Sequence, residues 1–509
     1  MTKPMTGKVF LVGAGPGDPG LITVKGQKIL ESCDVVVYDN LIPDELIVTL
    51  PKNIEKHYVG KRGGKICTSQ NEINELLFKL ARDGKTVVRL KGSDPIIFGR
   101  GGEEARFLKK NDIPFEIIPG VTAAVAASAY AGIPLTDREK ASFLTFATGH
   151  KAGDKEISSV PWRQIAALPG GTLAIYMGVG EISNITKELL DGGADASTPA
   201  AIIERGTYPT SRTVISTLER LPDDAVQNNI KSPAVIIIGK TINLRKSMEW
   251  MASRPLLGKR VMVTRPGHQA TPMYDLLRSY GAEVLPYPTI VIREIIDESG
   301  WKQLQECTSD NKWLLFTSEN GVEYFLKQYL SRYNDIRTLS QYKIARMGFG
   351  TLRALQNHHL GDDYAPEKSS SLALAEGLAA QPGIKDNTIV RVTGAMDTDP
   401  VAKILETAGA EVVPLVVYKS AFSYWPDEAK EKLFEYPPDY IVFTSGRSVD
   451  GFMVNLDKQE LERLIETAKI VSIGQTTSKV IESYGLKVDY EAKVPSIESV
   501  VDELAEWAQ

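Results

Sequence analysis

Short apolar runs rich in β-branched residues alternate with amphipathic stretches along the whole chain. The runs that have the length and composition of buried strands are 8–15, 34–39, 86–92, 115–120, 172–178, 199–206 and 234–240. The stretches between them, such as 71–84, carry apolar residues at helical spacing. Because apolar strands separated by helices are typical of parallel sheets covered on both faces, the pattern predicts an α/β protein with parallel sheets.

The pattern is interrupted over 244–260, which we interpret as a linker, and beyond it the chain contains an internal repeat. The segments that recur in the same order, at offsets of 126 to 128 residues, are 281–288 with 409–416, 314–325 with 441–452, and Gly348 with Gly474. The repeat predicts two similar α/β domains with a ligand-binding cleft between them. Independent occurrence of similar strand–turn–helix segments is the alternative.

Composition limits the class of function. The 509 residues include 59 Lys and Arg and 64 Asp and Glu, for a formal net charge of −5, which argues against a dedicated nucleic-acid-binding protein. Cys33, Cys67 and Cys307 are too far apart to predict a disulfide framework or a metal site. No apolar run reaches the about 18 residues of a membrane-spanning helix, and the first residues leave no room for a signal peptide. We therefore expect a cytoplasmic protein without a membrane partner.

A glycine-rich turn at 13–18 follows a predicted strand, and the next strand ends at Asp39. This order invites comparison with a dinucleotide-binding turn. However, Asp18 places a carboxylate where a small residue should let a pyrophosphate approach, and Pro16 removes an amide N–H. NAD is therefore disfavoured, and a turn needed only for its geometry remains an alternative.

Other loops after predicted strands also carry candidate chemistry. The loop at 89–107 contains Gly92-Ser93-Asp94-Pro95, whose glycine permits close approach of a ligand. The segment 118–139 leads into a helix of small residues, suited to a flat ligand or to plain core packing. Cationic residues follow several strands: Lys61, Arg62, Lys65, Arg89, Lys91, Arg100 and Arg138. If these loops converge, they form a basic mouth for a polyanionic small molecule; solvated surface cations are the alternative.

Taken together and in order, these segments resemble the tetrapyrrole methylases, and most closely the uroporphyrinogen-III C-methyltransferases. The resemblance covers about 1–245 and rests on 12–20 (VGAGPGDPG), 35–40, 59–65 (VGKRGGK), 89–104 (RLKGSDPIIFGRGGEE), 119–139, 147–150, 176–180, 202–207 and 232–240. It implies an S-adenosyl-L-methionine-dependent enzyme with two α/β subdomains, about 1–118 and 119–245. It also implies a homodimer that forms through this half.

The resemblance further implies the roles of individual residues. Asp39 matches the family's proposed base and Lys61 its proposed proton donor, while Arg62 and Arg100 would bind the carboxylates of the substrate. A carboxylate suits this chemistry because removal of the pyrrole N–H proton makes the ring carbon a better nucleophile. The residues expected to contact S-adenosylmethionine are Pro16, Gly92, Ser93, Asp94, Ile97, Thr122, Ala123, Met177 and Gly206. Two positions depart from the family pattern: Ser93 replaces a glycine, and Asp137 replaces a histidine.

The second half offers no obvious catalyst. From 258 on there is no metal-ligand cluster, nucleophile–His–acid set or phosphate loop, and the adjacent His358 and His359 are best interpreted as surface residues. Ser and Thr hydroxyls and glycines follow several predicted strands, where helix N-termini can bind carboxylates. Helix capping explains each Ser or Thr equally well.

This half resembles uroporphyrinogen-III synthase, through 261–267 (VMVTRPG), 316–322 (FTSENGV), 412–420, 440–449 (YIVFTSGRSV) and 472–478 (SIGQTTS). The resemblance implies two α/β domains joined by a two-stranded connector. After a linker at 246–257, domain one would comprise 258–290 and 422–509, and domain two 291–421. Cutting the chain at the repeat would instead give tandem domains.

The implied reaction is closure of hydroxymethylbilane with loss of water and inversion of the last ring, without a cofactor. Tyr418 matches the tyrosine proposed to assist departure of the hydroxyl, although a cross-strand packing role is the alternative. The residues expected to bind substrate are Thr317, Ser318, Ser445 and the pair Thr476 and Thr477.

Together the two resemblances imply consecutive steps, from hydroxymethylbilane to uroporphyrinogen III and then to precorrin-2, on the way to sirohaem or cobalamin. The alternative is a methyltransferase for a later precorrin, fused to a domain that binds tetrapyrrole without catalysis.

Overall fold

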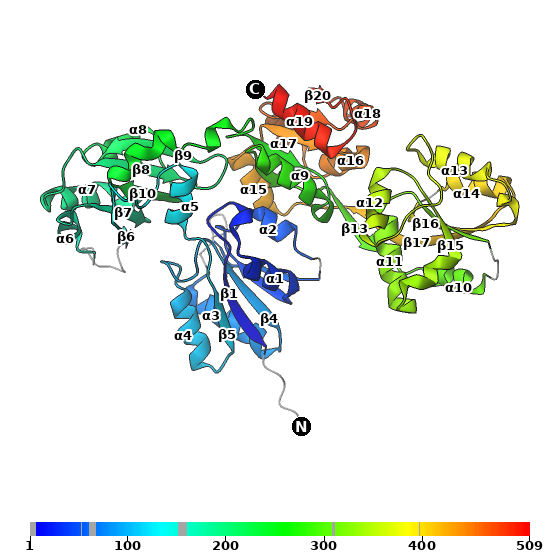
Figure 1. Cartoon of the computed structure of the whole chain (residues 1–509), viewed down its shortest axis with the longest axis horizontal. Coiled ribbons are helices and arrows are strands. Elements are labelled where there is room, and N and C mark those ends of the chain that lie inside the picture. The colour runs from blue at the N-terminus through cyan, green and yellow to red at the C-terminus, as the bar shows by residue number, and fades with distance from the viewer. Residues whose placement is uncertain are drawn as a thin grey trace. The chain divides into compact units, whose positions relative to one another are not determined.

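The computed structural model describes residues 7–51, 53–60, 68–150, 160–307, 311–396 and 398–508 (Figure 1). The chain divides into two compact units. Unit 1 is Met1–Pro288 with Trp425–Gln509, and unit 2 is Thr289–Tyr424. Within the described ranges, none of the helices combines the length and hydropathy needed to cross a bilayer.

The first sheet of unit 1 is parallel throughout, in the order β3-β2-β4-β1-β5. Its strands are β1 (Lys8–Gly13), β2 (Val35–Tyr38), β3 (Glu55–Tyr58), β4 (Thr86–Lys91) and β5 (Phe115–Ile118), and its helices are α1 (Val24–Ser32), α2 (Asp44–Val48), α3 (Gln70–Arg82) and α4 (Gly101–Lys110). Alternate residues of β2 enter two separate cores, one with α3 and α4 and the other with α1 and α2. For this first sheet, the prediction of a parallel sheet covered by helices on both faces is confirmed.

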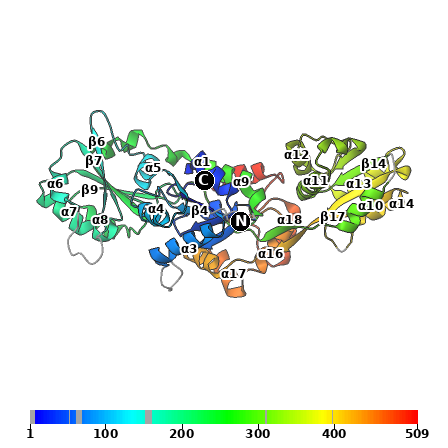
Figure 2. The same ribbon diagram turned by 90° about the horizontal axis from the view of Figure 1, so that it is seen from below.

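The second sheet of unit 1 is mixed, in the order β6-β7-β10-β8-β9, and only its β6–β7 pair is parallel. Its strands are β6 (Phe143–Thr148), β7 (Gly171–Tyr176), β8 (Pro199–Glu204), β9 (Arg212–Thr217) and β10 (Ala234–Ile238). Helices α6 (Trp162–Ala166), α7 (Ile182–Asp191) and α8 (Leu221–Gln227) cover one face, and α5 (Ala123–Tyr130) the other (Figure 2).

The prediction of parallel sheets throughout is wrong for this second sheet. Strand β10 is central and mostly buried, so its apolar run carries no information on its direction. A short connection joins β8 to β9, which permits antiparallel pairing. Strands β6 and β9 lie at the two edges and are only partly buried, and the search for apolar runs missed them.

The predicted linker is ordered and anchored at both ends. It overlaps the 3₁₀ segment η3 (Lys240–Ser247) and contains a second one, η4 (Met251–Ser253). The Trp250 indole N–H donates to the Ala129 carbonyl oxygen over 3.0 Å, and Leu256 is fully buried in the core of the third sheet. The segment therefore attaches the third sheet to helix α5 of the second.

The third sheet of unit 1 is parallel, in the order β12-β11-β18-β19-β20. Its strands are β11 (Arg260–Val263), β12 (Glu283–Pro286), β18 (Tyr440–Phe443), β19 (Lys469–Ser472) and β20 (Tyr490–Glu491). Helices α9 (Gly267–Ser279) and α19 (Ile497–Trp507) pack on one face. The other face carries α15 (Asp427–Glu435), α16 (Gly446–Met453), α17 (Lys458–Ile465) and α18 (Gln475–Ser483).

Unit 2 contains one sheet, in the order β13-β17-β16-β14-β15. Its strands are β13 (Ile290–Glu294), β14 (Lys312–Phe316), β15 (Tyr342–Arg346), β16 (Thr388–Gly394) and β17 (Glu411–Phe422). Helices α10 (Glu298–Glu306), α11 (Glu319–Tyr333) and α12 (Phe349–Asn357) cover one face, and α13 (Ser371–Ala379) and α14 (Pro400–Thr407) the other. The chain enters along β13 and leaves along β17, and these two strands pair antiparallel beside the crossings expected near 290 and 421.

The internal repeat corresponds to equivalent local structures. Ser318 and Ser445 both precede a helix, and their hydroxyls accept from Gly321 N (3.0 Å) and Ser448 N (3.2 Å). The sheets share one order, β12-β11-β18-β19 in unit 1 and β17-β16-β14-β15 in unit 2. Each sheet therefore combines the first half of one repeat with the second half of the other. Tandem domains cut at the repeat would split both sheets.

Candidate active sites

Glycine-rich loops meet at the carboxyl end of the first sheet. The backbones of Gly15 and Ser93 bond to each other, with N–O distances of 3.3 and 2.7 Å. A Cβ atom on Gly13 would lie 2.6 Å from the Gly120 Cα, so only glycine permits this approach. The segments around Pro16, Gly92 and Thr122, which are expected to bind S-adenosylmethionine, therefore lie against one another.

Asp94 joins two of these loops. One carboxylate oxygen accepts from the amides of Ile96 (2.8 Å) and Ile97 (2.9 Å), and the other from Gly120 N (3.1 Å). The residue is 8% exposed. These hydrogen bonds show that Asp94 holds the loop in shape. The apolar side chains of Ile97 and Phe98, which follow it in the same loop, are partly exposed.

Ser93 takes a left-handed conformation, with φ of 66°, which explains the glycine usually found here in the family that this half resembles. Its hydroxyl accepts from Ala123 N at the start of α5 (2.7 Å). The hydroxyl of Tyr176 accepts from the next amide, Ala124 N (3.0 Å), and lies 2.7 Å from the Thr122 hydroxyl. Ser93 therefore supplies a helix cap that glycine cannot supply. Burial raises the pKa of Tyr176, which keeps this hydroxyl neutral.

Two further residues expected at the cofactor site lie on loops of the second sheet. Met177 has φ of 52° and is 51% exposed. Gly206 packs against α5 so closely that a Cβ atom would lie 2.3 Å from the Ala127 Cβ. Tyr176 was not predicted at this site from sequence, although it directly precedes Met177 in the segment 176–180 that carries the resemblance.

Asp39 follows β2 and is held by two donors. Its carboxylate accepts from Leu41 N (3.1 Å) and from the Arg89 guanidinium (2.9 Å), and its side chain is 21% exposed. Arg89 extends into a buried ionic network in which Glu104, fully buried, accepts from Lys91 (2.9 Å) and lies 3.4 Å from Arg89. Burial and the neighbouring Arg89 lower the pKa of Lys91. The network fixes the orientation of the Asp39 carboxylate.

The expected basic mouth is corrected in part. Arg89 and Lys91 are 4% and 6% exposed, because each is paired with a buried or partly buried carboxylate. Arg100 is exposed and forms a bidentate pair with Glu103, with distances of 2.9 and 2.7 Å. Lys61, Arg62 and Lys65 lie outside the described residues. Among the cationic residues named from sequence that the structure describes, Arg100 and Arg138 are thus the exposed ones.

Asp137, the other departure from the family pattern, has a local structural role. Its carboxylate oxygen accepts from Glu139 N (3.0 Å) and Lys140 N (2.9 Å). This is an Asx turn, for which aspartate is well suited.

In unit 2, Tyr418 lies next to Ser318, another residue expected at the synthase site, and next to Tyr324, which was not expected there. Its hydroxyl is 3.0 Å from that of Ser318, and its ring stacks on Tyr324 with centroids 6.2 Å apart. A Cβ atom on Gly394 would lie 2.7 Å from the Tyr418 ring. The Thr317 hydroxyl accepts a hydrogen bond from the Arg391 guanidinium (3.0 Å), and Arg391 also pairs with Asp399 at 3.2 Å. Arg391 is buried, and this burial lowers its pKa.

The remaining synthase residues named from sequence belong to unit 1. Ser445 caps α16 through its hydroxyl. Thr476 is exposed at the start of α18, whereas Thr477 is 4% exposed, because adjacent residues of a helix point in different directions. The two threonines therefore do not share one accessible surface, although the family pattern predicts a pair facing the cleft.

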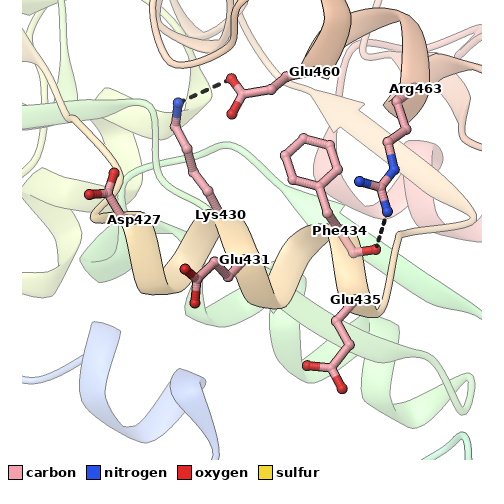
Figure 3. A pocket seen from close by; sticks show the side chains of 7 residues that line it. All are labelled: Asp427, Lys430, Glu431, Phe434, Glu435, Glu460 and Arg463. Atoms are coloured by element: carbon pink, nitrogen blue, oxygen red, sulfur yellow. Dashed lines mark hydrogen bonds and ion pairs between the residues drawn. The ribbon is translucent and has the colours of Figure 1, made fainter. Parts of the chain in front are cut away.

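A concave surface of about 470 Å³ lies between α15 and α17 (Figure 3). In it, Lys430 pairs with Glu460 at 3.2 Å and Arg463 donates to the Phe434 carbonyl oxygen, also at 3.2 Å. None of the residues expected at either site lines it.

Comparisons with known proteins assign both halves. Residues 8–222 match the family of tetrapyrrole (corrin/porphyrin) methylases, and 272–502 match uroporphyrinogen-III synthase HemD. The porphyrin biosynthesis protein HemD of Ruminiclostridium josui is 36% identical over 501 residues, which cover 98% of each chain.

Other relatives match the first half alone. The uroporphyrinogen-III C-methyltransferase of Methanocaldococcus jannaschii is 48% identical over 244 residues, 48% of this chain and 100% of that protein. The solved structure of the native uroporphyrin III C-methyl transferase from Thermus thermophilus is 40% identical, covers 47% of this chain and 100% of its own, and has a TM-score of 0.41. This chain thus belongs to the tetrapyrrole methylases over its first half and to the uroporphyrinogen-III synthases over its second.

Proposed function

We propose that this chain is a bifunctional enzyme of tetrapyrrole biosynthesis. Its second half closes hydroxymethylbilane to uroporphyrinogen III with loss of water, and its first half transfers two methyl groups from S-adenosylmethionine to give precorrin-2. The observation that carries the proposal is the 36% identity to one porphyrin biosynthesis protein along 98% of both chains. The order of the steps follows from the chemistry, because the product of the second half is the substrate of the first.

The residues of the first half fit S-adenosylmethionine. Gly92 and Gly206 are partly exposed and have no side chain to block the approach of a ligand, and the partly exposed Ile97 and Met177 offer apolar surface for an adenine ring. We propose that Pro16, Gly92, Ser93, Asp94, Ile97, Thr122, Ala123, Met177 and Gly206 hold this cofactor. When bound, it supplies an electrophilic methyl group on a sulfonium.

Asp39 is the proposed base of methyl transfer. Because Arg89 and Leu41 N hold its carboxylate from two sides, the partly exposed oxygens are fixed for a pyrrole N–H. Its removal of that proton raises the nucleophilicity of the ring carbon. Lys61 is the proposed proton donor, and Arg62 and Arg100 the proposed partners of the substrate carboxylates.

Tyr418 is the proposed acid of ring closure. Its hydroxyl, oriented by that of Ser318, can donate to the departing hydroxyl of hydroxymethylbilane. The substrate is already reactive, so orientation accounts for much of the remaining catalysis. The proposed partners of its carboxylates are Thr317, Ser318, Ser445 and Thr476. Thr477 is left out of this set, because it is only 4% exposed.

The same proposal extends to the setting of the enzyme. We expect a cytoplasmic homodimer, formed through the first half, that serves sirohaem or cobalamin synthesis. It would need no metal, membrane or nucleic-acid partner.

One assay tests both activities. The purified protein is incubated with hydroxymethylbilane, with and without S-adenosylmethionine, and the products are oxidised and separated. Uroporphyrin III without the cofactor and a dimethylated product with it are expected. Uroporphyrin I alone would show that the second half does not direct closure. Failure to methylate added uroporphyrinogen III would contradict the assignment of the first half.

A further inference from the structure

The connection between β8 and β9 contains a strained segment beside the proposed cofactor site. Arg205 and Thr207 have φ values of 49° and 74°, on either side of Gly206. Left-handed conformations are unfavourable for these side chains, and most of all for the β-branched threonine. Such strain persists only where surrounding contacts hold the backbone in place.

One set of contacts comes from the glycine-rich turn of the first sheet. The Thr207 hydroxyl accepts from Asp18 N (3.0 Å). A Cβ atom on Gly17 would lie 2.4 Å from the Tyr208 ring, so the two segments are in close contact. The conformation of 205–208 is therefore linked to the turn that contains Pro16.

The second set comes from the synthase half, through Glu283 at the start of β12. One carboxylate oxygen accepts from the Arg205 guanidinium (2.8 Å) and the other from the Thr210 hydroxyl (2.7 Å). Arg205 and Thr210 lie near opposite ends of the connection between β8 and β9, which contains the strained segment 205–208, so a single carboxylate holds this connection on both sides of the strain. The Glu283 side chain is only 10% exposed, and charge-assisted bonds in such a position are strong.

Neighbouring groups keep Arg205 and Glu283 in place. The Arg205 guanidinium lies over the ring of Tyr208 at 4.6 Å and over that of Tyr436, from the synthase half, at 5.3 Å. Arg260 lies 3.4 Å from the Glu283 carboxylate. The contact is thus part of a packed interface within unit 1.

We propose that Glu283 is a positioning residue for methyl transfer: from the synthase half, it holds 205–208 in the conformation that completes the cofactor site. The inference rests on the proposed S-adenosylmethionine-dependent activity of the first half. It follows that the methylase half reaches its full affinity for the cofactor only when the synthase half is packed against it.

The test compares two isosteric substitutions in the full chain. Glu283→Gln removes the negative charge of the carboxylate to which Arg205 and Thr210 both donate. Glu411→Gln is a matched control, because Glu411 occupies the equivalent place in the repeat, at the start of β17, and bonds to Thr388 in unit 2 (2.8 Å). Calorimetric titration with S-adenosylhomocysteine measures the affinity, and steady-state assays give KM and kcat for methyl transfer.

For Glu283→Gln we expect the dissociation constant and the KM for S-adenosylmethionine to rise about tenfold, in the usual range of coupling between sites. Ring closure by the same sample should keep its wild-type rate, which a general loss of structure would not allow. Unchanged affinity in Glu283→Gln, or an equal loss in Glu411→Gln, would overturn the inference.

If Glu283→Gln does not fold, Thr210→Val decides the question, because it removes one bond and keeps the ion pair. A smaller rise in the same two constants supports the inference, and wild-type values overturn it. A wild-type chain that binds no S-adenosylhomocysteine would instead contradict the proposed function of the first half, and the inference would fall with it.

Discussion

Asp39 shows how a single candidate base is prepared at the residue scale. It is bound by Arg89, which in turn belongs to a buried set with Glu104 and Lys91. Its position after β2 follows from the sequence pattern, but its partners do not. Arg89 and Lys91 lie on the same face of β4, two residues apart. Their charges can be buried there because helix α4 places the carboxylate of Glu104 beside them, and the sequence around β4 does not indicate this partner.

Replacing Asp39 by Asn should lower kcat for methyl transfer by about 10²- to 10⁴-fold, the usual contribution of a general base. Affinity for S-adenosylhomocysteine should change little, because the bonds of Asp39 are to Arg89 and Leu41. Stopped assays with uroporphyrinogen III and calorimetric titration measure the two effects. The exposed Asp83→Asn is the control, and an active Asp39→Asn enzyme would rule out this carboxylate as the base.

The hydroxyl of Tyr418 can be removed without its ring. Tyr418→Phe keeps the stacking on Tyr324 and loses the contact with Ser318. We expect the rate of ring closure to fall by about 10²-fold or more, in the range of general acid catalysis, with a shift of product from uroporphyrin III to uroporphyrin I. Chromatography of the oxidised products measures both. Tyr424→Phe, at a residue 73% exposed in the same unit, serves as the control; equal rates in the two variants would favour a packing role for Tyr418.

At the scale of elements, much of the fold could be predicted and the exceptions have clear causes. Apolar runs identified the buried strands of the first two sheets, because burial on both faces leaves a continuous signal. They missed the partly exposed edge strands β3, β6 and β9 and the direction of β10, since none of these is encoded in hydrophobicity alone. The repeat that contains Ser318 and Ser445 predicted two similar α/β domains, and the equivalent order of the two sheets confirms this.

The start of α5 depends on a residue from another loop. Ser93→Ala should keep the strained backbone and lose the hydroxyl that accepts from Ala123, which destabilises the first half by about 1 kcal/mol. Ser93→Gly loses the same bond, but it also relieves the left-handed strain, which stabilises the first half by about 1 kcal/mol. The two effects offset each other, so the stability of Ser93→Gly should be close to that of the wild type. Thermal unfolding of the full chain, followed by calorimetry, measures both. A lower midpoint for Ser93→Gly than for Ser93→Ala would contradict this account of the cap.

At the scale of the whole chain, contacts between the two halves within unit 1 could not be predicted from sequence. The pairs Arg205–Glu283 and Arg278–Glu45 join residues 78 and more than 200 positions apart, and neither member of a pair carries a local signal. By contrast, the way in which the two sheets of the second half combine segments of both repeats could be predicted from sequence. The repeat and the family resemblance together specified which segments belong to one sheet.

Glu45 makes the packing of the two halves dependent on pH. Burial raises the pKa of this carboxyl from its usual 4.5 to about 7, against the opposing effect of Arg278, which lies 3.1 Å away in α9. A carboxyl whose pKa is higher in the folded state contributes stability below the unfolded pKa, and this contribution is lost as the pH rises through the folded pKa. Unit 1 should therefore lose stability between about pH 4.5 and pH 7, by at most about 3 kcal/mol.

Glu45→Gln should remove this dependence, because the amide resembles the protonated carboxyl at every pH. We expect its midpoint of thermal unfolding to equal that of the wild type near pH 5 and to exceed it at pH 8. The exposed Glu75→Gln, in α3, should follow the wild type at both values. If Glu45→Gln is instead less stable than the wild type at pH 8, the ion pair with Arg278 outweighs the burial of the carboxylate. The docking of the synthase half on α2 would then be strengthened, rather than weakened, by ionisation of Glu45.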